Sequence, residues 1–178
     1  MKKATFLLIA AALTACSSLH ISYDYDKQAD FSKYKTWAFT TDSYKLPIEE
    51  LNRTRIMRAV ETQMTAKGFT KSDNPDVLID LNVKTEQRTE ATATTTGTGM
   101  YGGPWHYGYG GGFTTTQINY NHYVDGTLFV NMVDKATDKI TWQGRATKTL
   151  DPDVSAEKKE QNINNAVQRI FMNYPPHK

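Results

Sequence analysis

The chain has 178 residues, of which 39% are hydrophobic and 22% are charged, and its mean hydropathy is −0.58. This composition excludes a polytopic membrane protein and is compatible with one domain that has a modest core. The formal net charge of +2 reflects 21 Lys and Arg against 19 Asp and Glu, but Lys2 and Lys3 lie in an apolar leader. Without these two the balance is 19 to 19, which argues against a nucleic-acid binder that relies on a cationic surface.

The first residues have the layout of an exported lipoprotein. Lys2 and Lys3 precede an apolar run over residues 4–15, which has the length of a signal-peptide core and is too short to span a bilayer. The run ends in Leu-Thr-Ala before Cys16, which resembles the lipobox of bacterial lipoproteins. We therefore expect cleavage after residue 15 and a lipid on Cys16. A buried thiol that happens to follow a signal peptide is the less favoured alternative, because Cys16 is the only cysteine.

Lipidation would determine where the protein resides. Each buried methylene contributes about 0.8 kcal/mol, so the three acyl chains typical of such lipoproteins, palmitate among them, would form a permanent anchor. Ser17 follows Cys16, and the resemblance to enterobacterial sorting signals implies the periplasmic face of the outer membrane. Residues 17–20 reach at most about 14 Å. We therefore expect the domain to sit against the membrane, with the covalent lipid as its only prosthetic group.

Two strands and a helix are predicted next. Residues 21–25 alternate apolar and polar side chains, and residues 34–39 are rich in aromatic and β-branched side chains, so both segments are expected to be strands. An amphipathic helix is then expected to begin with Pro47 in its first position and to end at Gly68. Its apolar positions recur at multiples of four: Ile48, Ile56, Val60 and Met64.

The middle of the chain is predicted to be extended. Residues 77–83 alternate as in a strand that is buried on one side. Threonine dominates residues 85–96, so a continuation of this strand would have β propensity but little to bury, and we expect it to project from the core. Strand character resumes over residues 113–123. Asp125 and Gly126 are expected to form a turn before a further strand.

Residues 97–112 differ from their surroundings and are predicted to be a flexible tip. They hold eight of the eleven glycines together with Trp105 and several tyrosines. Aromatic side chains dominate interface anchoring, so the candidate partner-binding residues are Tyr101, Trp105, Tyr107 and Tyr109. A tip without any partner is an equally weighted alternative.

The last part of the chain completes the predicted fold. Residues 128–133 and 140–146 are expected to be strands joined by a hairpin connection. Ser155 is a plausible N-cap of a terminal helix whose apolar stripe comprises Ile163, Ala166, Val167, Ile170 and Phe171. Two helices and about six strands, mostly antiparallel with one strand-helix-strand crossover, predict an α+β fold. We expect a two-layer sandwich in which both helices lie on one face of the sheet.

Three segments together are similar to the domain of unknown function 4136 family, a family of bacterial lipoproteins. They are the lipidated N-terminus, the aromatic run over residues 30–39 and the block over residues 126–144, which reads Gly-Thr-Leu-Phe-Val and later Ile-Thr-Trp-Gln-Gly. The resemblance implies an envelope lipoprotein with an α/β sandwich, and it implies no catalytic residue. The aromatic tip departs from the compact family pattern.

Motifs that would indicate an enzyme or a cofactor are weak. Gly97, Gly99 and Gly102 match the dinucleotide fingerprint formally, but neither a buried strand nor a helix flanks them as that motif requires. His106 and His122 could approach each other across a hairpin and bind a metal. The sequence has no zinc-ligand spacing that supports this, so exposed loop histidines are the favoured interpretation.

Asp134 and Asp138 are the most suggestive pair of carboxylates. Aspartates that flank a turn normally accept hydrogen bonds from its backbone amides, so we interpret them as turn residues. With no nucleophile elbow, phosphate-binding loop or metal motif, we expect no catalytic site, no metal and no cofactor other than the lipid.

The sequence thus favours a signal peptide over residues 1–15, a lipidated tether over residues 16–20 and a single domain over residues 21–178. The expected function is a non-enzymatic interaction or assembly module of the cell envelope that contacts the membrane through its lipid and an envelope protein through its tip. A small-molecule or lipid carrier, with a pocket between helices and sheet, is the alternative.

Overall fold

The computed structural model describes residues 19–97 and 114–176, and within them one six-stranded sheet is formed with the strand order β1-β6-β5-β4-β2-β3. The strands are β1 (His20–Tyr25), β2 (Thr36–Phe39), β3 (Thr70–Lys71), β4 (Val77–Gly97), β5 (Thr114–Asp134) and β6 (Lys139–Leu150). The helices are α1 (Glu50–Ala66) and α2 (Ala156–Phe171), with short 3₁₀ helices η1 (Phe31–Lys33) and η2 (Asp42–Lys45). This confirms the α+β class.

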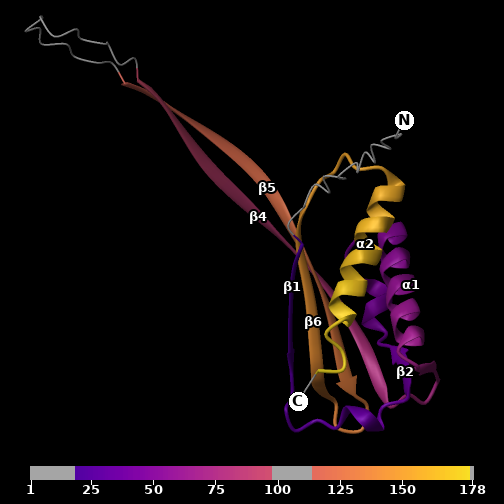
Figure 1. Cartoon of the computed structure of the whole chain (residues 1–178). Coiled ribbons are helices and arrows are strands. Elements are labelled where there is room, and N and C mark those ends of the chain that lie inside the picture. Colours follow the sequence, from indigo (N-terminus) through magenta and orange to yellow (C-terminus); the bar gives the residue numbers. More distant parts are fainter. Residues whose placement is uncertain (1–18, 98–113, 177–178) are drawn as a thin grey trace, which may run out of the picture.

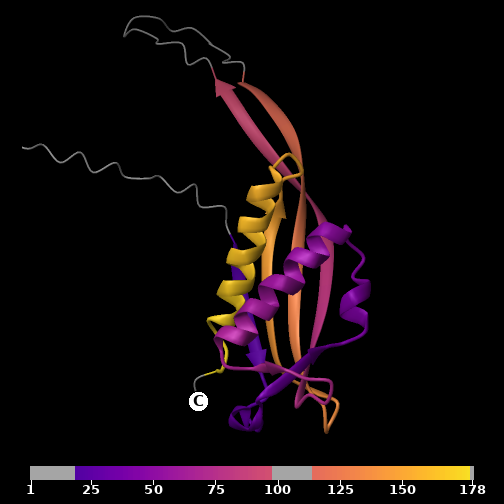
Figure 2. The same cartoon turned by 90° about the vertical axis from the view of Figure 1, so that its right-hand side faces the viewer.

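The sheet is mixed. Strand β2 runs parallel to both β3 and β4, whereas the β1–β6, β6–β5 and β5–β4 pairs are antiparallel. The path from β2 through α1 to β4 is the strand-helix-strand crossover that the sequence predicts. Both helices lie against the same face of the sheet (Figures 1 and 2).

The core lies between that face and the helices. The largest fully buried side chains come from both layers and include Trp37, Trp142, Phe171, Met64 and Ile79. The rings of Trp142 and Phe171 have centroids 5.8 Å apart, which joins β6 to α2. Burial of each such side chain contributes about 1.5–3 kcal/mol, so this contact zone stabilises the fold. The apolar helix positions expected from the sequence therefore do face the core.

The beginning of α1 differs from the expectation. Pro47 does not occupy the first helical position, because the chain bends at Pro47 and Ile48 and the helix begins at Glu50. Leu46, just before the bend, lies in the core, where only 4% of it is exposed. Burial of Leu46 thus outweighs an earlier helix start at the proline. The end is as predicted, since Gly68 follows the helix with a φ of +84°.

The predicted turn at Asp125 and Gly126 is wrong. Strand β5 runs without interruption from Thr114 to Asp134, and Gly126 pairs with Thr85 on one side and Lys148 on the other. A Cβ atom at Gly126 would lie 2.9 Å from Cδ2 of Leu150, so glycine here makes room for a side chain on the adjoining strand. The same residue type that signals a turn can also relieve a close contact within a sheet.

Strand β3 and the N-cap of α2 are two smaller features of the fold. Strand β3 has only two residues, too few for a periodic pattern, and it was not expected. Ser155 does cap α2, since its side chain accepts a hydrogen bond from the backbone N–H of Lys158.

Candidate interaction surface

Strands β4 and β5 continue far beyond the rest of the sheet as a two-stranded ribbon. Strand β6 ends at Leu150, which pairs with Val124. Among the described strands, the ten pairs from Arg88–Tyr123 to Gly97–Thr114 therefore have only each other as partners. At about 3.3 Å per residue the ribbon is about 33 Å long. It stands clear of both helices (Figure 1). The projection of the threonine-rich continuation is therefore confirmed.

The ribbon has two chemically different faces, because side chains alternate along each strand. Ile118 and Tyr120 lie opposite Ala93 and Ala91 on the face that continues the helix-covered side of the sheet. Ile118 is 53% exposed and Tyr120 is 64% exposed. The opposite face carries hydroxyl and amide side chains such as Asn119. One face is thus mildly apolar and the other polar, and both are open to solvent.

The charged side chains of the ribbon gather at its base. Arg88 donates from Nε to Oδ2 of Asp125 at 3.1 Å, pairs with Glu90, and stacks its guanidinium over the Tyr123 ring at 5.3 Å from the centroid. Thr149 of β6 donates to Asp125 at 2.6 Å. These contacts fasten the base of the ribbon to the last paired residues of the sheet.

Most of the residues that the sequence singles out lie outside the described residues. This applies to the lipidation site Cys16, to the candidate partner-binding residues Tyr101, Trp105, Tyr107 and Tyr109, and to His106. His122 is described, and it is an exposed residue of the ribbon whose Nδ1 lies 3.0 Å from the hydroxyl of Thr89. Among the described residues, no three His, Cys, Asp or Glu side chains gather as a metal site would require.

The N-terminal segment joins the fold at the same end of the sheet from which the ribbon projects. His20, the first residue of β1, pairs with Thr147, only three residues from the end of β6. Cys16 precedes the first described residue, Leu19, by three positions. The described chain therefore begins near the base of the ribbon.

Asp134 lies where β5 ends and is held by four donors. Oδ2 accepts from Nζ of Lys33 at 2.6 Å and from the hydroxyl of Tyr34 at 2.8 Å, and Oδ1 accepts from the amides of Ala136 and Thr137. Its side chain is 4% exposed. The bonds to Lys33, Tyr34 and the turn amides hold the pKa of Asp134 far below its usual value. The turn interpretation is confirmed, and the contacts to Lys33 and Tyr34 come in addition.

No sequence signal could have revealed those two additional contacts, since Lys33 and Asp134 are 101 residues apart. Asp138 is not part of the cluster. It occupies the left-handed region with a φ of 54°, a conformation that aspartate tolerates in tight turns. The two aspartates are therefore both turn residues.

A row of polar side chains crosses the sheet on the face away from the helices. Asp80 accepts from Asn131 at 3.0 Å, from Asn82 at 2.7 Å and from Thr40 at 3.1 Å, and Gln143 donates to Asn131 at 2.7 Å. These hydrogen bonds link the side chains across strands β6, β5 and β4. This row keeps that face of the sheet polar, and both oxygens of Asp80 accept hydrogen bonds within it.

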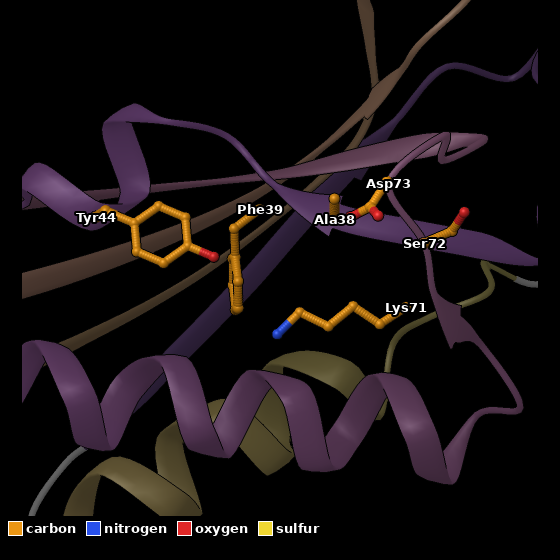
Figure 3. A pocket seen from close by; sticks show the side chains of 6 residues that line it. All are labelled: Ala38, Phe39, Tyr44, Lys71, Ser72 and Asp73. Atoms are coloured by element: carbon orange, nitrogen blue, oxygen red, sulfur yellow. The ribbon is translucent and has the colours of Figure 1, made fainter.

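The edge of β2 beside the short β3 has a hollow of about 390 Å³, shown in Figure 3 and lined by Ala38, Phe39, Tyr44, Lys71, Ser72 and Asp73. The ammonium of Lys71 points along it toward the Phe39 ring, 5.7 Å from its centroid, and lies 5.6 Å from that of Trp37. It also pairs with Glu61 at 3.1 Å. The one cation of the hollow is thus already engaged by the protein itself.

A second hollow of about 330 Å³ is lined only by residues of the two helices, most of them polar, such as Arg55 of α1 and Glu160 of α2. Neither hollow lies between the helices and the sheet, where fully buried side chains such as Trp142 and Ile170 fill the space. Within the described residues, no helix is long and apolar enough to cross a membrane.

The structure therefore defines an α+β protein with a mixed sheet, two helices on one face and a projecting strand pair as its most accessible feature. Its sequence matches the family Domain of unknown function (DUF4136) over residues 21–176, and the chain belongs to that family. No curated protein sequence matches it.

Solved structures show a similar fold. A PDZ domain protein from Parabacteroides distasonis ATCC 8503 has a TM-score of 0.54 at 19% identity, and the match covers 89% of this chain but only 36% of that one, so the chain spans about a third of that protein's length. The PelC dodecamer from Paraburkholderia phytofirmans has a TM-score of 0.44 at 7% identity, covering 90% of this chain and 99% of that one. At 19% identity, the likeness to the PDZ domain protein concerns the fold alone.

Proposed function

We propose that this chain is a lipid-anchored lipoprotein on the periplasmic face of the outer membrane and that it acts as a non-enzymatic interaction or assembly module. The observation that carries the proposal is the ribbon formed by β4 and β5. A two-stranded ribbon of ten pairs has little to bury by itself and is at best marginally stable in water. A partner that packs against the ribbon would offset the conformational entropy that is lost when the ribbon is ordered.

The anchor is supported by the sequence around Cys16 and by the place where its tether joins the fold. The tether joins the sheet beside the base of the ribbon, because His20 pairs with Thr147. An acylated Cys16, with palmitate among its chains, would therefore hold the ribbon end of the domain near the membrane. The ribbon would then reach partners at or near the membrane surface.

The other polar clusters support a non-enzymatic role. Asp134 and Asp80 each have their oxygens engaged by protein donors, and Lys71 is paired with Glu61. Catalytic groups need a reacting atom within hydrogen-bond reach and a pocket that receives it. The carrier alternative has less support, since buried side chains fill the space between helices and sheet.

Photo-crosslinking in cells tests the proposal on the full chain. A photo-reactive residue in place of Tyr120, which is 64% exposed, should give a discrete protein adduct. The matched control position is Leu51 on α1, which is 69% exposed and does not belong to the ribbon. An absence of protein adducts from Tyr120, or equal adducts from both positions, would contradict the ribbon as the contact surface.

Two variants separate the anchor from the ribbon. Cys16→Ser should move the chain from the membrane fraction to the soluble fraction, and retention in the membrane would contradict the lipid anchor. Replacement of residues 91–120 by Asn-Gly, a sequence that favours a tight hairpin turn, also removes the crosslinking position, so co-purification is its readout. The variant should no longer retain the protein identified in the Tyr120 adduct, and the melting temperature of the domain should be unchanged. Shortening only residues 98–113 in the same way is the control that keeps the described ribbon intact.

A further inference from the structure

The peptide groups on the free edge of β4 can be assigned from two hydrogen bonds near its base. The N–H of Leu81 donates to Oγ of Ser43 at 2.9 Å, and the carbonyl of Ile79 accepts from the N–H of Thr40 at 2.9 Å. Both groups point away from β5. Because every second residue points its peptide groups to the same side of a strand, those of Ala91 and Ala93 also point outward.

The free edge of β5 follows from the same pairing. Leu81 lies opposite Val130, so the peptide groups of Val130 point away from β4, as do those of every second residue of β5. From Val124 onward these groups face β6. Beyond it, at Tyr120 and Ile118, they face no other strand of the described chain. The ribbon thus has two open edges with unpaired donors and acceptors.

These edges lack the features that normally prevent edge pairing. Residues 91–97 and 114–121 contain no charged residue and no proline, and most are threonine, asparagine, glutamine or β-branched. Natural edge strands are usually protected by charge, proline, bulges or a covering segment. The same protein does cover the β4 edge lower down, where Ser43 caps Leu81. An uncharged edge of high β propensity is therefore expected to pair with another strand.

The side chains beside the edges are also suited to strand pairing. Within one ribbon Ala91 lies opposite Tyr120, and Ala93 lies opposite Ile118, so one strand offers small side chains and the other large ones on the same face. A second ribbon placed with its β5 beside this β4 would set its own large residues next to the small ones. Such cross-strand contacts stabilise a sheet.

A second copy of this chain is the occupant that the geometry favours, and here the inference rests on the proposed lipid anchor. Tethers of equal length would hold all copies in one orientation and place their ribbons at the same height above the membrane, which raises the effective concentration of each edge. In that orientation β4 of one copy runs antiparallel to β5 of the next. The hydrocarbon core of a membrane, in contrast, offers no donors or acceptors to the open edges.

We propose that the ribbons of neighbouring copies pair edge to edge, with β4 of one copy against β5 of the next. The contact is head to tail, since each copy uses two different edges. This identifies the partner class for the ribbon as the chain itself.

The primary test expresses two differently tagged full-length chains in the same cells, one with a photo-reactive residue in place of Ile118. The expected product carries both tags, has twice the mass of one chain, and is joined within β4 of the second copy. An adduct joined outside β4, an adduct with another protein, a phospholipid adduct only, or no adduct would each overturn the inference. Fractionation of the same cells tests the anchor separately. A two-tag adduct in the soluble fraction would contradict the anchor and leave the pairing intact.

Edge-blocking variants test the head-to-tail arrangement. Ala91→Pro removes an outward N–H from the β4 edge and spares the hydrogen bonds to β5, and Tyr120→Pro does the same for the β5 edge. Each variant alone should lose at least nine-tenths of the two-tag adduct, whereas Ala91→Thr should retain it. The mixture of the two proline variants should regain the adduct, because one open edge of each kind remains.

That recovery would also show that each variant ribbon still folds. Ala93→Pro gives a second, independent block of the β4 edge and should behave as Ala91→Pro does. Retention of the adduct by Ala91→Pro and Ala93→Pro on their own, or no recovery in the mixture, would overturn head-to-tail pairing.

Discussion

The hydroxyl of Tyr34 donates a hydrogen bond to Oδ2 of Asp134 at 2.8 Å, across 100 residues of sequence. This bond joins the segment before β2 to the end of β5, and Lys33 reinforces it from the solvent side, where its side chain is 52% exposed. Asp134 therefore fastens the lower end of the sheet, opposite the end from which the ribbon projects.

Replacement of Asp134 should weaken the fold and change its response to acid. Asp134→Asn removes the charge that four donors surround, and we expect a loss of about 2 kcal/mol at neutral pH, measured by urea unfolding. Because the folded-state pKa of Asp134 lies below its ordinary value of 3.8, its contribution is complete above that pH and is lost as the pH falls below it. The variant should therefore lose less stability than the parent between about pH 4 and pH 2. Identical acid profiles would contradict this assignment.

Tyr174 offers the opposite case. Its ring is buried, and its hydroxyl has no hydrogen-bond partner among the described residues. Tyr174→Phe should therefore stabilise the protein by about 1 kcal/mol in thermal or urea unfolding. The matched control is Tyr34→Phe, which removes the bond to Asp134 and should destabilise by a similar amount. A loss of stability in Tyr174→Phe would show that the hydroxyl does have a partner.

The same tyrosine should influence stability in alkali. Burial raises the pKa of Tyr174 above its ordinary value of 10.0, so the folded state favours the protonated hydroxyl. This contribution is complete below pH 10 and is lost as the pH rises above it. Tyr174→Phe should therefore flatten the decline in unfolding free energy above pH 10. A decline as steep as that of the parent would assign the alkaline sensitivity to other groups.

Gly144 controls the approach of α2 to the sheet. A Cβ atom at this position would lie 2.5 Å from Cγ2 of Ile170 and 2.6 Å from Cη2 of Trp142. Gly144→Ala should cost about 1–3 kcal/mol through overpacking, measured by urea unfolding. In an Ile170→Ala background the same substitution should cost less, because the space has been vacated. Additive losses would mean that the clash with Ile170 is not the cause.

Hydrogen exchange should distinguish the ribbon from the sheet. The backbone N–H groups of Thr92 and Leu78 point to the same side of β4, but only Leu78 lies where further strands flank the β4–β5 pair. In the dilute, detergent-solubilised chain we expect the opening free energy to be about 3 kcal/mol lower at Thr92, or about a hundredfold faster exchange. Edge pairing on membranes should slow exchange at Thr92 and leave Leu78 unchanged. Equal exchange at both positions in the dilute chain would show that the ribbon is stable by itself.

The periodic parts of the chain were predictable, because local pattern and tertiary environment agree there. The apolar stripe of α2 and its cap at Ser155 both follow from spacing and residue type. The failures occur where long-range packing overrides a local signal. Gly126 accommodates Leu150 instead of forming a turn, and Leu46 enters the core at the expense of an earlier helix start at Pro47.

Local sequence patterns were enough to predict the fold class and the projection of a threonine-rich strand pair, and they supply the expectation of a lipid at Cys16, because each depends on a short segment. The three-dimensional arrangement was needed to show which peptide groups of Ala91 and Tyr120 remain open and that β1 begins beside the base of the ribbon. Those features depend on strand order and register. Pairing between distant segments sets both, and no local periodicity encodes it.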